Sequence, residues 1–202
     1  MDTSQGITNT LILAIDVGTQ SIRASLFDTK GNIVAINKVP MPDYQSPESE
    51  WLELDLGQFW DRFCLTTSQL FARCTSAQIS AIAGMSITTQ RSTVVNLDID
   101  GKPLRPAIIW LDQRKALNTK SLKFLDKAAL YAVGMYAAVT YASKECEAHW
   151  IQENQPEIWA KTHKYLLLSG YITYKLTGQY CDSIGSMVGF FPFDYKRQKW
   201  AS

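Results

Sequence analysis

The sequence predicts an α/β domain with a mixed central sheet, the element order β-β-β-α-β, and helices on both faces of the sheet. Three observations lead to this prediction. Three short apolar segments separated by turn residues open the chain, an amphipathic helical segment follows, and an apolar segment of strand length comes next. The last segment is apolar on both faces, which is typical of a central strand in a sheet covered on both sides.

The first three strands are expected at residues 10–16, 21–28 and 33–39. The turns between them fall at residues 17–20 and 29–32, and each contains a glycine. Because connections this short join antiparallel neighbours, we expect a three-stranded meander.

A helix is expected over residues 56–74. Asp55 precedes it as the N-cap, and Gln58 follows three residues later in the pattern of a capping box. A strand over residues 79–88 comes next, and the resulting order β-β-β-α-β implies a mixed sheet.

The second half of the sequence combines two more strands with a largely helical region. Strands are expected at residues 92–97 and 107–110, separated by a turn at Asp100–Pro103. Residues 112–178 have a mostly helical pattern. Helices are expected over residues 143–153, 156–162 and 169–176, the last one ending at Gly178.

The composition excludes several classes of protein. The 202 residues are 46% hydrophobic, which is enough for one sizeable core. The net charge of +1 comes without a basic stripe, so we expect no nucleic-acid partner. No basic leader and no apolar run of about 18 residues occurs, and we expect a cytoplasmic protein without membrane attachment. Four cysteines without CxxC spacing favour free thiols over a zinc site or disulfides.

The segment Asp16-Val-Gly18-Thr19 lies where a strand ends and a tight turn begins. A carboxylate at a strand tip can hold Mg²⁺ through water, glycine lets the backbone approach a phosphate, and the next hydroxyl and amide can donate to phosphate oxygens. Taken alone, the segment is better explained as an ordinary hairpin turn.

Five segments carry motifs in order along the chain. They are LILAIDVGTQSIRASLFDTKGNIV at residues 11–34, WLELD at 51–55, ITTQRST at 87–93, KP and AIIWLDQR within 102–114, and YKLTG with Asp182 at 174–182. In this order they resemble the amino-terminal domain of the FGGY carbohydrate kinases, which belong to the actin-like ATPase superfamily. Neither GxxxxGK[ST] nor GxGxxG occurs, so P-loop and Rossmann enzymes are disfavoured.

The resemblance implies an actin-like (ribonuclease H-like) fold and an enzyme that phosphorylates a hydroxyl of a sugar or polyol with ATP and Mg²⁺. It implies that residues 1–202 are the sugar-binding and phosphate-hairpin half, incomplete at the carboxyl end, with the nucleotide-binding carboxyl-terminal domain absent. The family's general base belongs to a Gly-Asp-Gln-type segment, which we expect beyond Ser202. No catalytic residue is therefore assigned, and we expect the 202 residues alone to be inactive.

The resemblance also assigns the phosphate side of the site. Asp16 would hold the metal and its waters, and Gly18, Thr19, Gln20 and Arg23 would line the phosphates. Gln20 replaces a threonine that relatives often carry. For Arg23, a solvated outward side chain is an equally weighted interpretation.

On the substrate side the resemblance assigns Gln90, Arg91, Trp110 and Asp112. Arg91 offers a rigid fork of donors to sugar hydroxyls, with a structural ion pair as the alternative. Trp110 would form an aromatic platform for sugar carbons, with a buried core side chain as an equal alternative. Ser92 replaces the glutamate of glycerol-kinase-like members, which argues against glycerol.

Several points stay open at this stage. Residues 136–150 align with the family in two registers, one that matches Lys144 and one that matches Trp150. His149 and His163 are expected in core or surface roles. A non-catalytic sugar-binding or regulatory protein is the alternative function, and a homo-oligomer is neither predicted nor excluded.

Overall fold

The computed structural model describes residues 10–117, 123–187, 193–194 and 196–200, and the chain forms two compact units. Unit 1 combines Met1–Asp43, Asp55–Arg91 and Leu168–Ser202, and unit 2 combines Tyr44–Leu54 and Ser92–Leu167. The chain therefore passes between the units several times.

Unit 1 is built on the expected mixed sheet. Its strands are β1 (Leu11–Val17), β2 (Ser21–Asp28), β3 (Ile33–Pro40) and β5 (Ile82–Thr89), in the order β3-β2-β1-β5. The first three pair antiparallel as a meander, while β1 and β5 pair parallel. The mixed α/β fold class is thereby confirmed.

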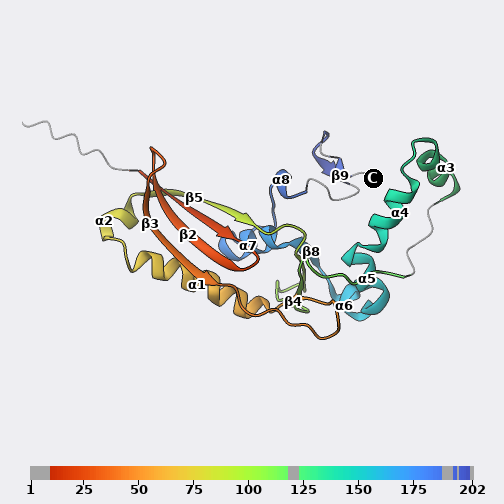
Figure 1. Ribbon diagram of the computed structural model, residues 1–202, viewed down its shortest axis with the longest axis horizontal. Coiled ribbons are helices and arrows are strands. Elements are labelled where there is room, and N and C mark those ends of the chain that lie inside the picture. Colours follow the sequence, from red (N-terminus) through yellow and green to blue (C-terminus); the bar gives the residue numbers. More distant parts are fainter. Residues whose placement is uncertain (1–9, 118–122, 188–192, 195, 201–202) are drawn as a thin grey trace, which may run out of the picture. The chain divides into compact units, whose positions relative to one another are not determined.

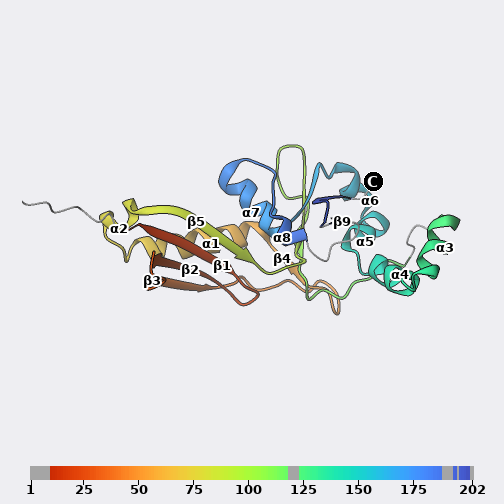
Figure 2. The same cartoon turned by 90° about the horizontal axis from the view of Figure 1, so that it is seen from above.

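Helix α1 (Leu56–Phe71) covers one face of this sheet and runs along β2 and β3 (Figures 1 and 2). It buries Phe59 and Leu70, and alternate strand residues such as Ile15 are buried too. Asp55 caps the helix as predicted, because its carboxylate accepts from the backbone N–H of Gln58 at 2.8 Å.

Two expectations about this sheet differ from the structure. Within the described residues β5 is an edge strand, and Met85 in its middle is 46% exposed. Helix α7 (Leu168–Thr177) lies on the same side as α1, because the Lys175 ammonium is 4.7 Å from the centre of the Trp60 ring. The opposite face of the strands carries exposed side chains such as Ile12, so the described helices cover one face and not both.

Unit 2 contains a second, antiparallel sheet with the order β4-β7-β6-β8. Its strands are β4 (Glu53–Leu54), β7 (Ala107–Ile108), β6 (Val94–Leu97) and β8 (Lys164–Leu167). Strand β8 falls in a region that the sequence pattern made helical. Val94, Ile108, Ala116, Trp150 and Ile151 form the core beside this sheet.

The helices of unit 2 come from the region expected to be helical. They are α3 (Phe124–Ala132), α4 (Tyr136–Lys144), α5 (Glu147–Asn154) and α6 (Pro156–Lys161). The remaining elements of unit 1 are α2 (Ser76–Ser80), α8 (Ile184–Met187), β9 (Phe193–Asp194) and β10 (Lys199–Trp200). Among the described residues no helix is long and apolar enough to cross a membrane. The four cysteines are free.

The N-cap of α1 provides a test of the fold. Asp55→Ala leaves an amide at the helix start without its acceptor, and we expect a loss of about 1 kcal/mol in the free energy of unfolding. Urea denaturation followed by circular dichroism measures it. Asp61→Ala, at an exposed position inside the same helix, is the control and should stay within about 0.5 kcal/mol of the native chain. Equal losses in the two variants would contradict the capping role.

Candidate functional site

The turn between β1 and β2 carries the residues predicted to contact phosphate. The Gly18 amide donates to the Ser21 carbonyl at 3.0 Å and closes the turn. The backbone of Gly18 is not in the left-handed region, and a Cβ added there would lie 3.4 Å from the Ser21 oxygen. The backbone conformation at this position therefore does not itself require glycine.

Asp16 and Arg23 lie directly opposite each other on β1 and β2. An Nη1 of Arg23 donates to Oδ2 of Asp16 at 2.9 Å, and the side chains are 45% (Arg23) and 47% (Asp16) exposed. The Arg23 side chain is therefore not buried in the core, and it is not only solvated, because it is paired with Asp16. The pair presents an accessible carboxylate and a neighbouring cation on one face of the hairpin.

This carboxylate is compatible with the predicted metal. No cluster of three or more side chains able to bind a metal occurs in the described residues. Mg²⁺ retains several waters and is commonly held by one or two carboxylates together with substrate phosphates, so a single accessible Asp16 suits it.

The parallel pairing of β1 with β5 brings a second motif to the same edge of the sheet. Asp16 is the register partner of Thr88, and the Gln90 amide donates to the Val17 carbonyl at 2.7 Å. Both side-chain polar atoms of Gln90 are buried without a hydrogen-bond partner in the described part of the chain. A buried amide of this kind is costly unless a ligand or water satisfies it. Arg91 follows with an exposed side chain.

Sequence reasoning missed Thr88 as a neighbour of Asp16. Its hydroxyl-bearing side chain is exposed, and only the register of β1 and β5 places it there. The next residue after Arg91 is Ser92, which has a left-handed backbone with φ of 56°. Such a conformation is uncommon for a residue other than glycine and occurs often at functional sites.

In unit 2, Trp110 lies at a corner just after β7. The Asp112 amide donates to the Ile109 carbonyl at 2.9 Å, so residues 109–112 form a tight turn with Trp110 and Leu111 in its middle. The Trp110 side chain is 49% exposed. Trp110 is therefore not a core residue, which rules out the alternative of a buried side chain.

Asp112 was assigned to the substrate, but its side chain is only 2% exposed. One carboxylate oxygen accepts from the Leu52 amide at 2.7 Å, and both oxygens accept from Arg114, with Nε to Oδ1 at 2.8 Å and Nη2 to Oδ2 at 2.7 Å. The Arg114 amide adds a fourth bond at 2.9 Å. The carboxylate is engaged within the chain, so the structure does not support direct contact with sugar.

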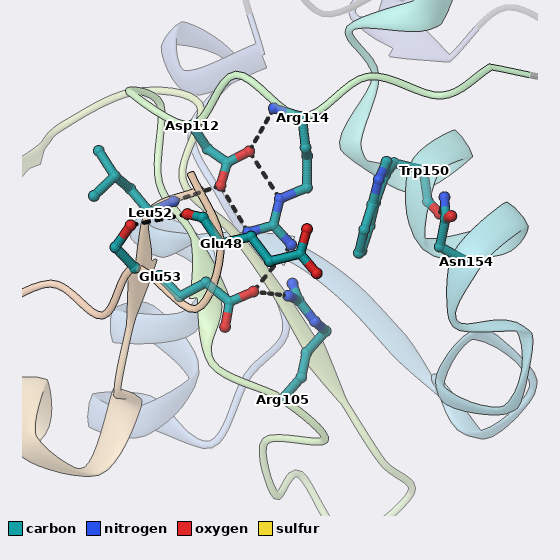
Figure 3. A network of polar contacts seen from close by, with 9 residues as sticks. Glu48, Leu52, Glu53, Arg105, Asp112, Arg114, Trp150 and Asn154 are labelled. Carbon is teal, nitrogen blue, oxygen red and sulfur yellow. Dashed lines mark hydrogen bonds and ion pairs between the residues drawn. The ribbon is translucent and has the colours of Figure 1, made fainter. Parts of the chain in front are cut away.

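Asp112 belongs to a buried charge network of two carboxylates and two guanidinium groups (Figure 3). Glu53 on β4 pairs with Arg105 and, at 2.9 Å, with Arg114. The guanidinium of Arg114 contacts two indole rings that pack edge-to-face on each other, 4.3 Å from the centre of Trp51 and 4.6 Å from that of Trp150. Burial lowers the pKa of Arg105, and the Glu53 carboxylate opposes this effect. The network is electrically balanced, as burial demands.

Residues 136–150 belong to two helices, α4 and α5. The structure therefore shows the surroundings of Lys144 and Trp150, the residues matched by the two alternative alignments. Lys144 ends α4 with an exposed side chain, whereas Trp150 is 5% exposed in the core. His149 bonds through Nδ1 to the Ser143 carbonyl at 2.8 Å. Its observed role is local and structural.

A fifth ionisable residue near the network, Glu147 at the start of α5, escaped the sequence reasoning. Burial raises the pKa of its carboxyl to about 7, the Asp112 and Glu145 carboxylates add to the rise, and Arg114 opposes it. In the unfolded chain the carboxyl should titrate near its ordinary value of 4.5. Stability from the neutral carboxyl is therefore fully present below pH 4.5 and is lost as the pH rises through 7.

Glu147→Gln tests this linkage. The amide cannot ionise, so we expect the variant to gain about 2 to 3 kcal/mol relative to the native chain between pH 4.5 and pH 8. Urea denaturation at both pH values measures the difference. Glu157→Gln, at an exposed position on α6, is the control and should show no comparable change between the two pH values. A pH-independent difference between Glu147→Gln and the native chain would refute the buried neutral carboxyl.

Comparison with known proteins supplies the family. The model of the N-terminal domain of the FGGY family of carbohydrate kinases matches residues 11–202. Glycerol kinase of Thermococcus gammatolerans is 28% identical over 199 residues, which cover 94% of this chain and 38% of that protein. Xylulose kinase of Lactococcus lactis is 26% identical over 198 residues, covering 95% and 38%.

Structural comparison agrees. The crystal structure of a xyloylose kinase from Brucella ovis matches with a TM-score of 0.75 and 26% identity, over 95% of this chain and 39% of that one. The chain thus spans well under half the length of these relatives. The five motifs, the actin-like mixed sheet and these matches agree that the chain belongs to the FGGY family of carbohydrate kinases.

Proposed function

We propose that the protein containing these residues transfers the terminal phosphoryl group of ATP to a hydroxyl of a small sugar or polyol. The family match and the names of the relatives, glycerol kinase and xylulose kinase, support this reaction class. The observation that carries the proposal is the pairing of β1 with β5, because it joins the Asp16 hairpin to the Gln90–Arg91 segment at one edge of the sheet.

The hairpin residues would bind the phosphates. Thr19 and Gln20 follow Gly18 in the turn, where small size at Gly18 leaves room for a phosphate oxygen near the backbone. Arg23 would donate to phosphate oxygens once its ion pair with Asp16 loosens, and Asp16 would then hold waters of the magnesium shell. Bound Mg²⁺ supplies neutralisation of phosphate charge.

Gln90 and Arg91 would contact the substrate hydroxyls. Gln90 brings an unsatisfied buried amide that can both donate and accept, and Arg91 brings five donors on an exposed side chain. Trp110 would provide an aromatic surface for the C–H face of a sugar. Serine at position 92, in place of the family's glutamate, favours a ketose or longer polyol over glycerol.

Phosphoryl transfer needs a base near the attacking hydroxyl, and the 202 residues contain no Gly-Asp-Gln segment. We therefore propose that these residues bind substrate but do not transfer phosphate by themselves. ATP-dependent phosphorylation of any sugar by the 202-residue chain would overturn this part of the proposal.

Substrate binding is tested by calorimetry of the chain against a panel of ketoses and polyols that includes xylulose and glycerol. We expect heat for at least one ketose or longer polyol, and a loss of about tenfold or more in affinity for it in Arg91→Ala, since a hydrogen bond from a charged group disappears. Lys30→Ala, on the exposed turn between β2 and β3, is the control and should bind normally. The absence of heat for every member would contradict the substrate proposal.

The phosphate side is tested by Gly18→Ala in the complete product of the gene. The backbone at Gly18 accepts a Cβ, so the melting temperature should stay within about 2 °C of the native value. Phosphoryl transfer should fall by about tenfold or more because the methyl group occupies the space proposed for a phosphate oxygen. Full activity in a stable variant would remove Gly18 from the site.

A further inference from the structure

We propose that Asp112 and Arg114 are positioning residues, which hold Trp110 at the corner of its turn without touching the sugar. This inference rests on the proposed function insofar as Trp110 contacts substrate. The holding of Trp110 itself is independent of any ligand, and the two parts can be tested separately.

Burial does not hold Trp110 in place. Its side chain is 49% exposed and that of Leu111, the other middle residue of the turn, is 38% exposed. An exposed turn usually samples several conformations, because few apolar contacts oppose its motion. The conformation of the turn backbone therefore decides where this half-exposed indole lies.

Three hydrogen bonds connect this turn to residues 50–52. The Ile109 amide donates to the Leu52 carbonyl at 3.2 Å, and the Gln113 amide donates to the Glu50 carbonyl at 3.0 Å. Between them, the Leu52 amide donates to the Asp112 carboxylate at 2.7 Å. The two outer bonds extend the ladder of β4 and β7 past the turn, and the central one depends on a side chain.

The Asp112 carboxylate is held in one orientation. Arg114 donates to both of its oxygens in a two-pronged pair, which fixes the plane of the carboxylate as well as its position. Turning the carboxylate would break these bonds inside the protein, where the side chains of Asp112 and Arg114 are 2% and 1% exposed. Hydrogen bonds broken at so buried a position are costly.

The Arg114 side chain is in turn held by its buried neighbours. The rings of Trp51 and Trp150 both pack against its guanidinium. Glu53 pairs with it from β4 (Figure 3). Glu53 is shared with Arg105, whose side chain is also buried. Arg114 and Asp112 therefore connect the exposed turn to buried side chains of the core.

The consequence for binding is preorganisation. A platform that is already ordered loses little conformational freedom when a sugar lies on it, whereas a mobile indole would have to be ordered at the expense of affinity. Asp112 and Arg114 would then influence sugar affinity only through Trp110.

The first test needs no ligand. The chain is labelled with 5-fluorotryptophan, and the ¹⁹F resonance of Trp110 among the six tryptophans is assigned with Trp110→Phe. We expect a single narrow Trp110 resonance in the native chain. In Arg114→Lys, which keeps the charge but loses the fork, and in Asp112→Asn, which keeps the shape, the resonance should broaden or split. The resonance of Trp159, which packs against Tyr165 in unit 2, reports that the variants remain folded.

Lys115→Met is the matched control, because Lys115 is next to Arg114 but exposed and paired with Glu145 at 3.2 Å. Its Trp110 resonance should stay narrow. A Trp110 resonance that is already broadened by exchange in the native chain would overturn the proposal without any variant. So would an unchanged resonance in a folded Arg114→Lys or Asp112→Asn chain.

The second test is a double-mutant cycle in the affinity for the sugar that gives heat in calorimetry. Arg114→Lys should weaken binding about fivefold or more in the native background and less than about twofold in Trp110→Ala, because its effect passes through Trp110. Equal losses in both backgrounds would show direct contact or general damage, and would refute positioning. A chain that binds no sugar contradicts the proposed function, while the resonance of Trp110 still decides whether Arg114 holds the turn.

Discussion

The guanidinium of Arg114 is the group on which the arrangement of unit 2 depends. A cation this deeply buried is tolerated because two carboxylates pair with it and two indole rings contact it. Removing either carboxylate would leave an uncompensated charge, at a typical cost of about 3 to 5 kcal/mol. The same contacts join β4, the turn after β7 and helix α5, so one side chain links segments distant in sequence.

Unit 1 depends on a different constraint, the parallel pairing of β1 with β5. Parallel strands end at the same edge of a sheet, so the hairpin that follows β1 and the segment that follows β5 are neighbours. The bond from the Gln90 amide to the Val17 carbonyl extends this pairing beyond the strands. Charge, hydroxyl groups and an unsatisfied amide gather there on a rigid sheet, which is the arrangement expected of a site that works by positioning.

Local patterns in the sequence were sufficient for the meander, for the cap of α1 and for the end of α7 at Gly178, whose φ is 72°. These patterns failed where contacts between residues distant in sequence determine the local structure. Strand β8 forms because it pairs with β6, and β5 lies at an edge although its sequence is apolar. The motif identified Asp112, but only the fold reveals that Arg114 and Leu52 occupy its carboxylate. Glu147 carried no motif, since its altered pKa comes from burial.

The central claim is that this chain contributes a phosphate hairpin and a sugar platform to a carbohydrate kinase. A crystal structure of the complete gene product with xylulose and a non-hydrolysable ATP analogue with Mg²⁺ tests it most directly. The account predicts phosphate oxygens beside the Gly18 turn, the metal's water shell at Asp16, and sugar carbons against the Trp110 ring. Nucleotide phosphates bound away from the β1–β2 hairpin, or a sugar that contacts neither Arg91 nor Trp110, would contradict it.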